Sequence, residues 1–278
     1  MIKFGTAGIP LSAKTGTTEA GIVRLKELGL EAMEVEFVRG VQMKEDKAGQ
    51  VRAVAERENI ALTCHAPYYI NLNSPEQEKV IASRSRLIQT ARVAKLLGAT
   101  SIVFHAAFYS GESKSEVLKK VINELVKVRE ELAKEGNHVI LRPETTGKPS
   151  QFGNLAEIII ISQEVPGVLP CIDFSHLHAR ENGAVNSYEE FCAILEQTAE
   201  GLAGRWTENA HFHISGIEYG QKGEKKHLVL KEADLKYEDL IKALINSGIK
   251  GTVICESPNL EEDAILLQKT YIDFLGSS

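Results

Sequence analysis

One short stretch of the chain combines residue types that bind divalent metal ions. Residues 171–178 read CIDFSHLH, in which an apolar run ends at Asp173 and is followed by His176 and His178. A carboxylate and imidazoles at the end of a strand-like run are suitable ligands for zinc and similar ions. The alternative is an exposed loop whose polar side chains contact only water, so the interpretation depends on partners elsewhere in the chain.

The same residue types recur where six consecutive strand-like runs end. They are His65, His105, Glu144, Asp173, His213 and Glu256, with His211 beside His213 and His176 just beyond Asp173. Each residue alone is more often a hydrogen-bonded structural group or an exposed loop residue than a metal ligand. Burying all of them without a counter-charge would cost several kcal/mol for each charged group. We therefore predict a metal site at the rim where these runs end.

Charge balance favours more than one ion at this rim. Glu144, Asp173 and Glu256, together with several neutral imidazoles, can neutralise more charge than a single divalent ion carries. Glu144 lies in the middle of the series, so its carboxylate is placed to bridge two ions. Two ions a few Å apart activate a water and stabilise the charge that develops during phosphodiester cleavage.

The elements that would position these residues alternate regularly along the chain. Strands are expected at residues 2–5, 32–37, 60–65, 100–105, 138–144, 167–173, 210–214 and 250–256. Helices are expected at residues 16–30, 43–58, 75–97, 113–135, 154–164, 187–203, 235–247 and 259–275. Strict alternation predicts a parallel sheet, and eight units predict one α/β domain over residues 1–278, a (β/α)8 TIM barrel. A doubly wound open sheet is the alternative, but the regular repeats favour the barrel.

The composition is that of an ordinary soluble globular protein. Hydrophobic residues make up 43% of the 278 residues and charged residues 25%. No apolar run approaches the ~20 residues that a membrane span needs, and the N-terminus lacks a signal-peptide pattern, so we expect a cytoplasmic monomer. The net charge of −6 does not indicate a nucleic-acid partner. It does not exclude one, because local clusters and bound ions change the field at a site.

The four cysteines do not form a metal-binding or redox motif of their own. Cys64, Cys171, Cys192 and Cys255 are far apart in sequence, and none belongs to a CxxC pair. Three of them lie at the ends of apolar runs, where a small buried thiol is common. We expect no disulfides.

Five segments together resemble the endonuclease IV family. They are HAPYYINL (65–72), PETTGKPSQFG (143–153), CIDFSHLHA (171–179), HFHISG (211–216) and ICES (254–257). Members of that family are zinc-dependent apurinic/apyrimidinic (AP) endonucleases of the xylose isomerase-like barrel superfamily. The resemblance implies a base-excision-repair enzyme that cuts double-stranded DNA 5′ to an abasic site, leaving a 3′-hydroxyl and a 5′-deoxyribose phosphate.

The resemblance also implies three groups of metal ligands. The first group is His65, His105 and Glu144, and the second is Glu144, Asp173, His213 and Glu256, with Glu144 bridging. Glu144 or Glu256 would orient the attacking water. Two or three Zn²⁺ ions are expected, although the mixed nitrogen and oxygen ligands also suit Mn²⁺ or Fe.

The third ligand group departs from the family pattern. The family pairs a histidine matching His176 with an Asp-x-His motif after the seventh strand. Here that loop reads GQKGEKKHLVL, which offers His227 but has a lysine or, shifted, Glu224 in place of the aspartate. His178 is a possible substitute ligand. The first strand also departs, because GTAGIP has no histidine where the family has Gly-x-His-Val.

The resemblance assigns DNA contacts as well. Tyr68 and Tyr69 match residues that wedge into the DNA stack, and Arg39 matches an arginine that inserts at the lesion. The alternative is that both tyrosines simply pack over the barrel rim. From their charge alone, Lys148, Lys222, Lys225 and Lys226 are candidates for phosphate contacts, although such a cluster is also typical of a solvated turn.

Two other functions fit parts of this pattern. A sugar isomerase or epimerase of the same superfamily would hold one divalent ion with the second ligand group and use its two glutamates to move a proton beside a carbonyl. It would not need His65, His105 or His176 as ligands. A non-catalytic barrel that binds damaged DNA or a sugar is the third possibility.

Overall fold

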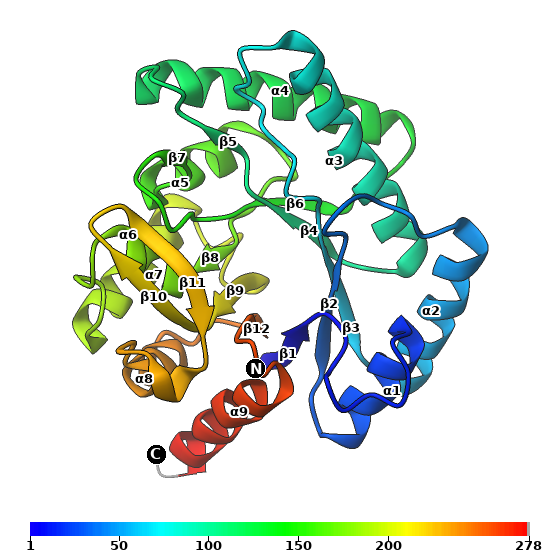
Figure 1. The fold of residues 1–278 in the computed structure, drawn as a ribbon, viewed down its shortest axis with the longest axis vertical. Coiled ribbons are helices and arrows are strands. Elements are labelled where there is room, and N and C mark those ends of the chain that lie inside the picture. The colour runs from blue at the N-terminus through cyan, green and yellow to red at the C-terminus, as the bar shows by residue number, and fades with distance from the viewer. Residues whose placement is uncertain (277–278) are drawn as a thin grey trace.

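The computed structural model describes residues 1–276 as a barrel of parallel strands with helices around it (Figure 1). Eight strands pair in the order β6-β4-β3-β2-β1-β12-β9-β8. Bridges between Leu141 and Val168 and between Glu144 and Cys171 join β6 to the β8 segment and close the circle. The predicted (β/α)8 TIM barrel is confirmed.

The barrel strands agree with the predicted positions except at the sixth. They are β1 (Ile2–Ala7), β2 (Ala32–Glu36), β3 (Ala61–His65), β4 (Ser101–Phe104), β6 (Ile140–Pro143), β8 (Ile172–Asp173), β9 (Ala210–Ile214) and β12 (Gly251–Cys255). The β1 strand pairs with both β2 and β12, so the first and last barrel strands lie side by side (Figure 1).

The predicted helices are all present outside the barrel. They are α1 (Thr18–Glu27), α2 (Glu45–Glu58), α3 (Gln77–Leu97), α4 (Lys114–Lys134), α5 (Leu155–Glu164), α7 (Tyr188–Gly201), α8 (Tyr237–Asn246) and α9 (Glu261–Gly276). Their starts follow local chemistry. Ser113 with Glu116, and Asn154 with Glu157, form capping boxes that fix where α4 and α5 begin. Among residues 1–276, no helix is both long and apolar enough to cross a membrane.

Alternation along the strands separates the apolar layer from the site. On β9, the Phe212 ring packs against Trp206 and Phe174, at centroid distances of 5.5 and 5.8 Å. Successive strand residues point to opposite faces, so His211 and His213 face the barrel interior instead. Strand β9 is therefore buried on both faces, with its histidines on the face toward the barrel interior.

The sixth predicted strand, at 167–173, is shorter than expected. Pro170 has no N–H to donate, and β8 is reduced to two residues after it, with only the isolated bridges at Val168 and Cys171 before. The following segment is a helix, α6 (Phe174–Arg180), because the Asp173 side chain accepts a 2.6 Å hydrogen bond from the His176 N–H and caps its first turn. All seven residues of α6 are buried, so the exposed-loop alternative is wrong.

Five further elements lie in the loops that follow the barrel strands. A hairpin of β10 (Gly216–Gly220) and β11 (Gly223–Leu228) follows β9, and the short 3-10 helix η1 (Leu230–Glu232) follows the hairpin. Strands β5 (Ala107–Phe108) and β7 (Gln151–Phe152) pair with each other after β4 and β6. None of these segments was among the predicted strands and helices.

Candidate metal centre

The C-terminal ends of the strands bring the predicted ligands together. Each barrel strand from β3 onward contributes one: His65 (β3), His105 (after β4), Glu144 (after β6), Asp173 (β8), His213 (β9) and Glu256 (after β12). Helix α6 adds His176, and β11 adds His227. The side chains form three compact ligand groups, in each of which the ligand atoms lie within 4.8 Å of one another.

The first group is His65, His105 and Glu144. The Glu144 Oε2 atom lies 2.8 Å from His105 Nε2 and 3.4 Å from His65 Nε2. Two ligand atoms that each bind one zinc at about 2.0–2.2 Å are roughly 3 Å apart. The spacing therefore fits three ligands that share one ion.

The second group is Glu144, Asp173, His213 and Glu256. The His213 Nδ1 atom lies 3.1 Å from Glu144 Oε1 and 3.4 Å from Glu256 Oε1. Asp173 Oδ1 accepts a hydrogen bond from the His176 N–H, whereas its buried Oδ2 has no hydrogen-bond partner and only a 3.3 Å contact with His176 Nδ1. An orphaned buried carboxylate oxygen is costly, and a cation at this position would satisfy it.

Glu144 belongs to both groups, with one oxygen in each. Oε2 faces the two histidines of the first group, and Oε1 faces His213 in the second. This is the arrangement that a carboxylate bridging two ions requires. The bridging role stays a prediction, but the geometry fits it.

The third group is His176, Glu224 and His227. The His176 Nε2 atom lies 3.5 Å from His227 Nε2 and 3.7 Å from Glu224 Oε2. Glu224 therefore stands where the family pattern has an aspartate, one of the two options that the sequence left open. His178 is not part of this group, because its nitrogens contact Asp234 Oδ1 at 3.0 Å and the Val185 carbonyl at 2.9 Å.

Backbone carbonyls orient three of the candidate ligand histidines. The Nδ1 atoms of His65, His176 and His227 lie 2.8, 3.0 and 3.1 Å from the carbonyl oxygens of Ala66, Thr145 and Glu256. A hydrogen bond from Nδ1–H to each carbonyl leaves Nε2 unprotonated and directed at the ligand group. Outer contacts of this kind are typical of metal-binding histidines.

The electrostatics of the metal-free centre also favour cations. Burial opposes ionisation of Glu144, yet His105 and His213 outweigh it and hold its pKa well below the usual range. Burial raises the pKa of Asp173 to about 7, with Glu256 and Glu144 adding to the rise. Burial also disfavours a charged His65, but Glu144 and Glu36 raise its pKa to about 10. Divalent ions would replace the protons that these groups otherwise need.

Comparison with known proteins places the chain in a family. A sequence profile of the xylose isomerase-like TIM barrel family matches residues 22–274. The chain belongs to the xylose isomerase-like TIM barrel family. It is 44% identical to "Uncharacterized protein MJ0133" of Methanocaldococcus jannaschii over 271 residues, 98% of this chain and 97% of that protein.

More distant relatives and similar structures have names that refer to two chemistries. The chain is 25% identical to a probable endonuclease 4 of Symbiobacterium thermophilum, over 92% of this chain and 94% of that protein. The endonuclease IV structure from Thermus thermophilus superposes with a TM-score of 0.72 at 18% identity, covering 99% of this chain and all of the other. A D-tagatose 3-epimerase-like protein superposes with a TM-score of 0.74 at 16% identity, covering 99% of each chain. At these identities the two structures support the fold alone.

This xylose isomerase-like barrel also has two acidic residues near the site that are not among the predicted ligands. Glu34, which is buried, and Glu36, which is half-buried, lie on β2, where apolar and acidic residues alternate. Burial raises the pKa of Glu36 to about 8. Glu34 is completely buried and contacts His211 and His213. The sequence signal was present, because β2 is central in a parallel sheet and such strands are buried on both faces.

The predicted DNA-contacting residues lie at or near the surface. The Tyr68 and Tyr69 side chains are 57% and 61% exposed, and the Tyr68 ring lies 5.6 Å from the His65 ring. Arg39 is exposed in the turn after β2. Tyr68 therefore lies next to the first ligand group, and stacking of the two tyrosines at a DNA lesion stays a prediction.

The lysines lie mainly on the hairpin. Lys222 is exposed at its turn, and Lys225 and Lys226 lie 3.2 and 3.5 Å from the two oxygens of Glu218. Lys148 is half-buried in the loop that receives the hairpin tip. Phosphate binding by these residues stays a prediction.

Proposed function

We propose that this chain is a metal-dependent endonuclease that cuts double-stranded DNA on the 5′ side of abasic sites. The observation that carries the proposal is the shared carboxylate of Glu144, which joins two ligand groups, with a third group beside them. A centre for two or three ions suits a phosphodiester, on which several charged oxygens must be stabilised. The relatives named probable endonuclease 4 support the same substrate.

The bound ions, Zn²⁺ in the first instance, would polarise the phosphate and activate a water. The protein supplies the groups that hold and orient the reactants. Burial opposes ionisation of Glu256, but His213 and His227 lower its pKa, so its carboxylate is charged at neutral pH and able to accept a proton from the attacking water. Glu144 would fix the position of that water from the other side.

The proposed reaction is a simple hydrolysis. The water oxygen attacks phosphorus in line with the O3′ atom, the bond between phosphorus and O3′ breaks, and the phosphate stays on the 5′ side of the abasic sugar. O3′ takes up a proton to become the 3′-hydroxyl. Tyr68 and Tyr69 would replace the base stacking that is lost at the lesion, and Arg39 would enter the helix beside them.

A nicking assay tests the proposal. Full-length protein loaded with Zn²⁺, Mn²⁺ or Fe²⁺ is incubated with a duplex that contains one tetrahydrofuran abasic analogue. We expect a single cut with a 3′-hydroxyl end, none in an undamaged duplex of the same sequence, and none after chelation. Intact abasic duplex under every metal condition, with the ions shown to be bound, would overturn the proposal.

A one-ion sugar epimerase is the second candidate. Its support is the second ligand group, which alone would hold one ion between Glu144 and Glu256, and the fold that the chain shares with epimerase structures. Elemental analysis separates the two functions. Two or three tightly bound ions per chain favour the nuclease, whereas one ion together with epimerisation of a ketohexose favours the epimerase.

A further inference from the structure

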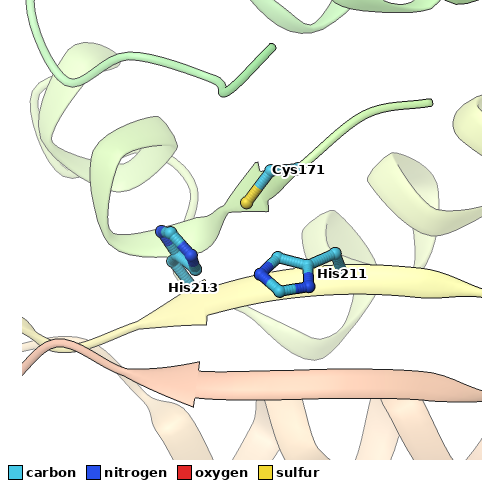
Figure 2. A group of neighbouring side chains, drawn as sticks. All are labelled: Cys171, His211 and His213. Atoms are coloured by element: carbon cyan, nitrogen blue, oxygen red, sulfur yellow. The ribbon is translucent and has the colours of Figure 1, made fainter. Parts of the chain in front are cut away.

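A fourth cluster of ligand atoms lies inside the barrel, below the rim. It comprises Glu34 on β2, Cys171 before β8, and His211 and His213 on β9, and we call it the inner cluster. Cys171 Sγ and one nitrogen of each histidine lie within 4.8 Å of one another. Figure 2 shows the thiol directed between the two imidazoles. All four residues are completely or almost completely buried.

Register explains how these residues meet. Asp173 pairs with His213 across β8 and β9, so Cys171 and His211 lie one inward-facing layer below them. Glu34 reaches the cluster from β2, where Thr63 donates a 2.7 Å hydrogen bond to its Oε2 atom. The inner cluster is therefore built on strands rather than loops.

The polar atoms of the inner cluster are close together but not paired. Glu34 Oε1 lies 2.9 Å from His213 Nε2, and Glu34 Oε2 lies 3.1 Å from His211 Nε2. Yet Glu34 Oε1, His211 Nε2 and His213 Nε2 are buried without any aligned hydrogen bond. Ligand atoms on one ion, each bound at about 2.1 Å, are roughly 3 Å apart and point at the ion rather than at each other. The short separations and the lack of aligned hydrogen bonds in the inner cluster are those expected of ligand atoms around one ion.

Arg142 does not satisfy these atoms. It is buried next to the cluster, but it donates to the carbonyls of Pro170 and Asn209 at 3.0 and 2.8 Å. Glu34 Oε1 therefore has no guanidinium donor, and its 2.9 Å contact with His213 Nε2 is not aligned as a hydrogen bond.

We infer that the inner cluster is a further metal site, with Cys171 Sγ, His211 Nε2, His213 Nε2 and a Glu34 oxygen as ligands. Sulfur, nitrogen and oxygen donors in this number suit a tetrahedral Zn²⁺ or Fe²⁺ ion. On binding, the Cys171 thiol releases its proton to solvent. His213 faces the rim with Nδ1 and the inner cluster with Nε2, so it would offer one nitrogen to each. This side chain would then connect the inner site to the rim.

The inner site is an inference beyond the proposed function. Its test measures metal binding and does not depend on nuclease activity. The rim groups contain no sulfur, so only the inner site gives a thiolate ligand to a bound metal. Cobalt(II) reports this difference, because a thiolate ligand adds a charge-transfer band in the near ultraviolet, whereas oxygen and nitrogen ligands give only weaker visible bands. The protein is stripped with a chelator and titrated with Co²⁺ without oxygen.

We expect the charge-transfer band in the wild-type protein and its loss in Cys171→Ser, with one equivalent of cobalt fewer. Cys64→Ser is the matched control, because Cys64 is an equally buried strand cysteine outside the cluster, and it should keep the band. His211→Gln should also lose the inner equivalent. Circular dichroism establishes that each variant is folded.

Two results would overturn the inference. One is a wild-type protein that binds cobalt, as its visible bands and elemental analysis show, without any thiolate band. This result needs no variant and is independent of whether Cys171→Ser folds. The other is a band that persists in folded Cys171→Ser or His211→Gln. A nuclease-negative protein with a thiolate band would reject the proposed function and leave the inner site standing.

Discussion

The first two ligand groups and the third are held by different kinds of structure. His65, Asp173 and His213 are the terminal or penultimate residues of barrel strands, whose neighbours fix them on both sides. Glu224 and His227 instead lie on the hairpin, outside the barrel. The hairpin is positioned by the Glu224 N–H, which donates to the Gly147 carbonyl at 2.9 Å, and by the His227 contact with the Glu256 carbonyl. The third ion should therefore be the easiest to remove separately.

The largest expected effect is on the first and second ligand groups, which we call the strand-borne groups. Glu144→Gln replaces a bridging carboxylate by an amide, so both ions of these groups lose a charged ligand. We expect ion affinity and abasic-site nicking to fall by more than the roughly 10- to 100-fold that outer-shell changes cause. Elemental analysis and the nicking assay measure the two effects. A variant that keeps both ions and full activity would show that Glu144 does not bridge.

A change confined to the hairpin should be selective. Glu224→Gln removes the charged ligand of the third group and leaves Glu144 untouched, so we expect one equivalent fewer of bound ion and a smaller loss of activity. Glu218→Gln is the matched control, because Glu218 lies on the same hairpin but pairs with Lys225 and Lys226. Loss of all bound ions in Glu224→Gln would show that the third group is not independent of the first two.

The docking of the hairpin can be loosened without changing any ligand. Gly223 has a φ of +86°, and an added Cβ would lie 2.3 Å from the Gly147 carbonyl oxygen. Gly223→Ala should push the hairpin tip away and break the Glu224 hydrogen bond to Gly147. We expect third-ion affinity to drop by about 10-fold, the size of an outer-shell loss, with the other two ions unaffected. Gly220→Ala is a milder control, because its Cβ would meet only the flexible Lys225 side chain at 3.3 Å.

The smallest expected effect is a pH dependence of the metal-free protein. The folded-state pKa values of Asp173 and Glu36 are raised to about 7 and 8, so their protonated forms favour folding. Their stabilising contribution is fully present below the unfolded-state values near 4 and is lost as the pH rises through 7 and 8. Ions at the strand-borne groups compete with the Asp173 proton, so the rise in melting temperature on adding Zn²⁺ should be larger at pH 8 than at pH 6. An equal rise at both values would contradict this account.

The parts that sequence could predict are those fixed by periodicity. Alternating strands and helices placed the barrel and the six strand ends, because in a parallel barrel the last residues of the strands meet at one rim. Glu224 was harder. Its direction depends on the hairpin register, which shifts between Glu218 and Tyr219, and a one-residue shift moves a side chain to the other face.

The missed residues have a common physical reason. Glu34 lies in a segment where acids alternate with apolar residues, a pattern that usually marks the solvent side of a half-buried strand. In a closed barrel both faces are covered, and the polar positions then point inward. His178 looked like a ligand by its spacing alone, but its Nε2 atom contacts Asp234, far along the chain, at 3.0 Å.

Asp173 links metal loading to local unfolding. One of its oxygens caps α6, and the other is free to bind an ion in the second group. An ion that fixes this side chain also fixes the cap, so opening of the first turn of α6 requires loss of the ion or of the hydrogen bond. Amide protons at the start of α6 should consequently exchange with deuterated solvent more slowly once the ion is bound, whereas those of α8, on the outside of the barrel, should not change.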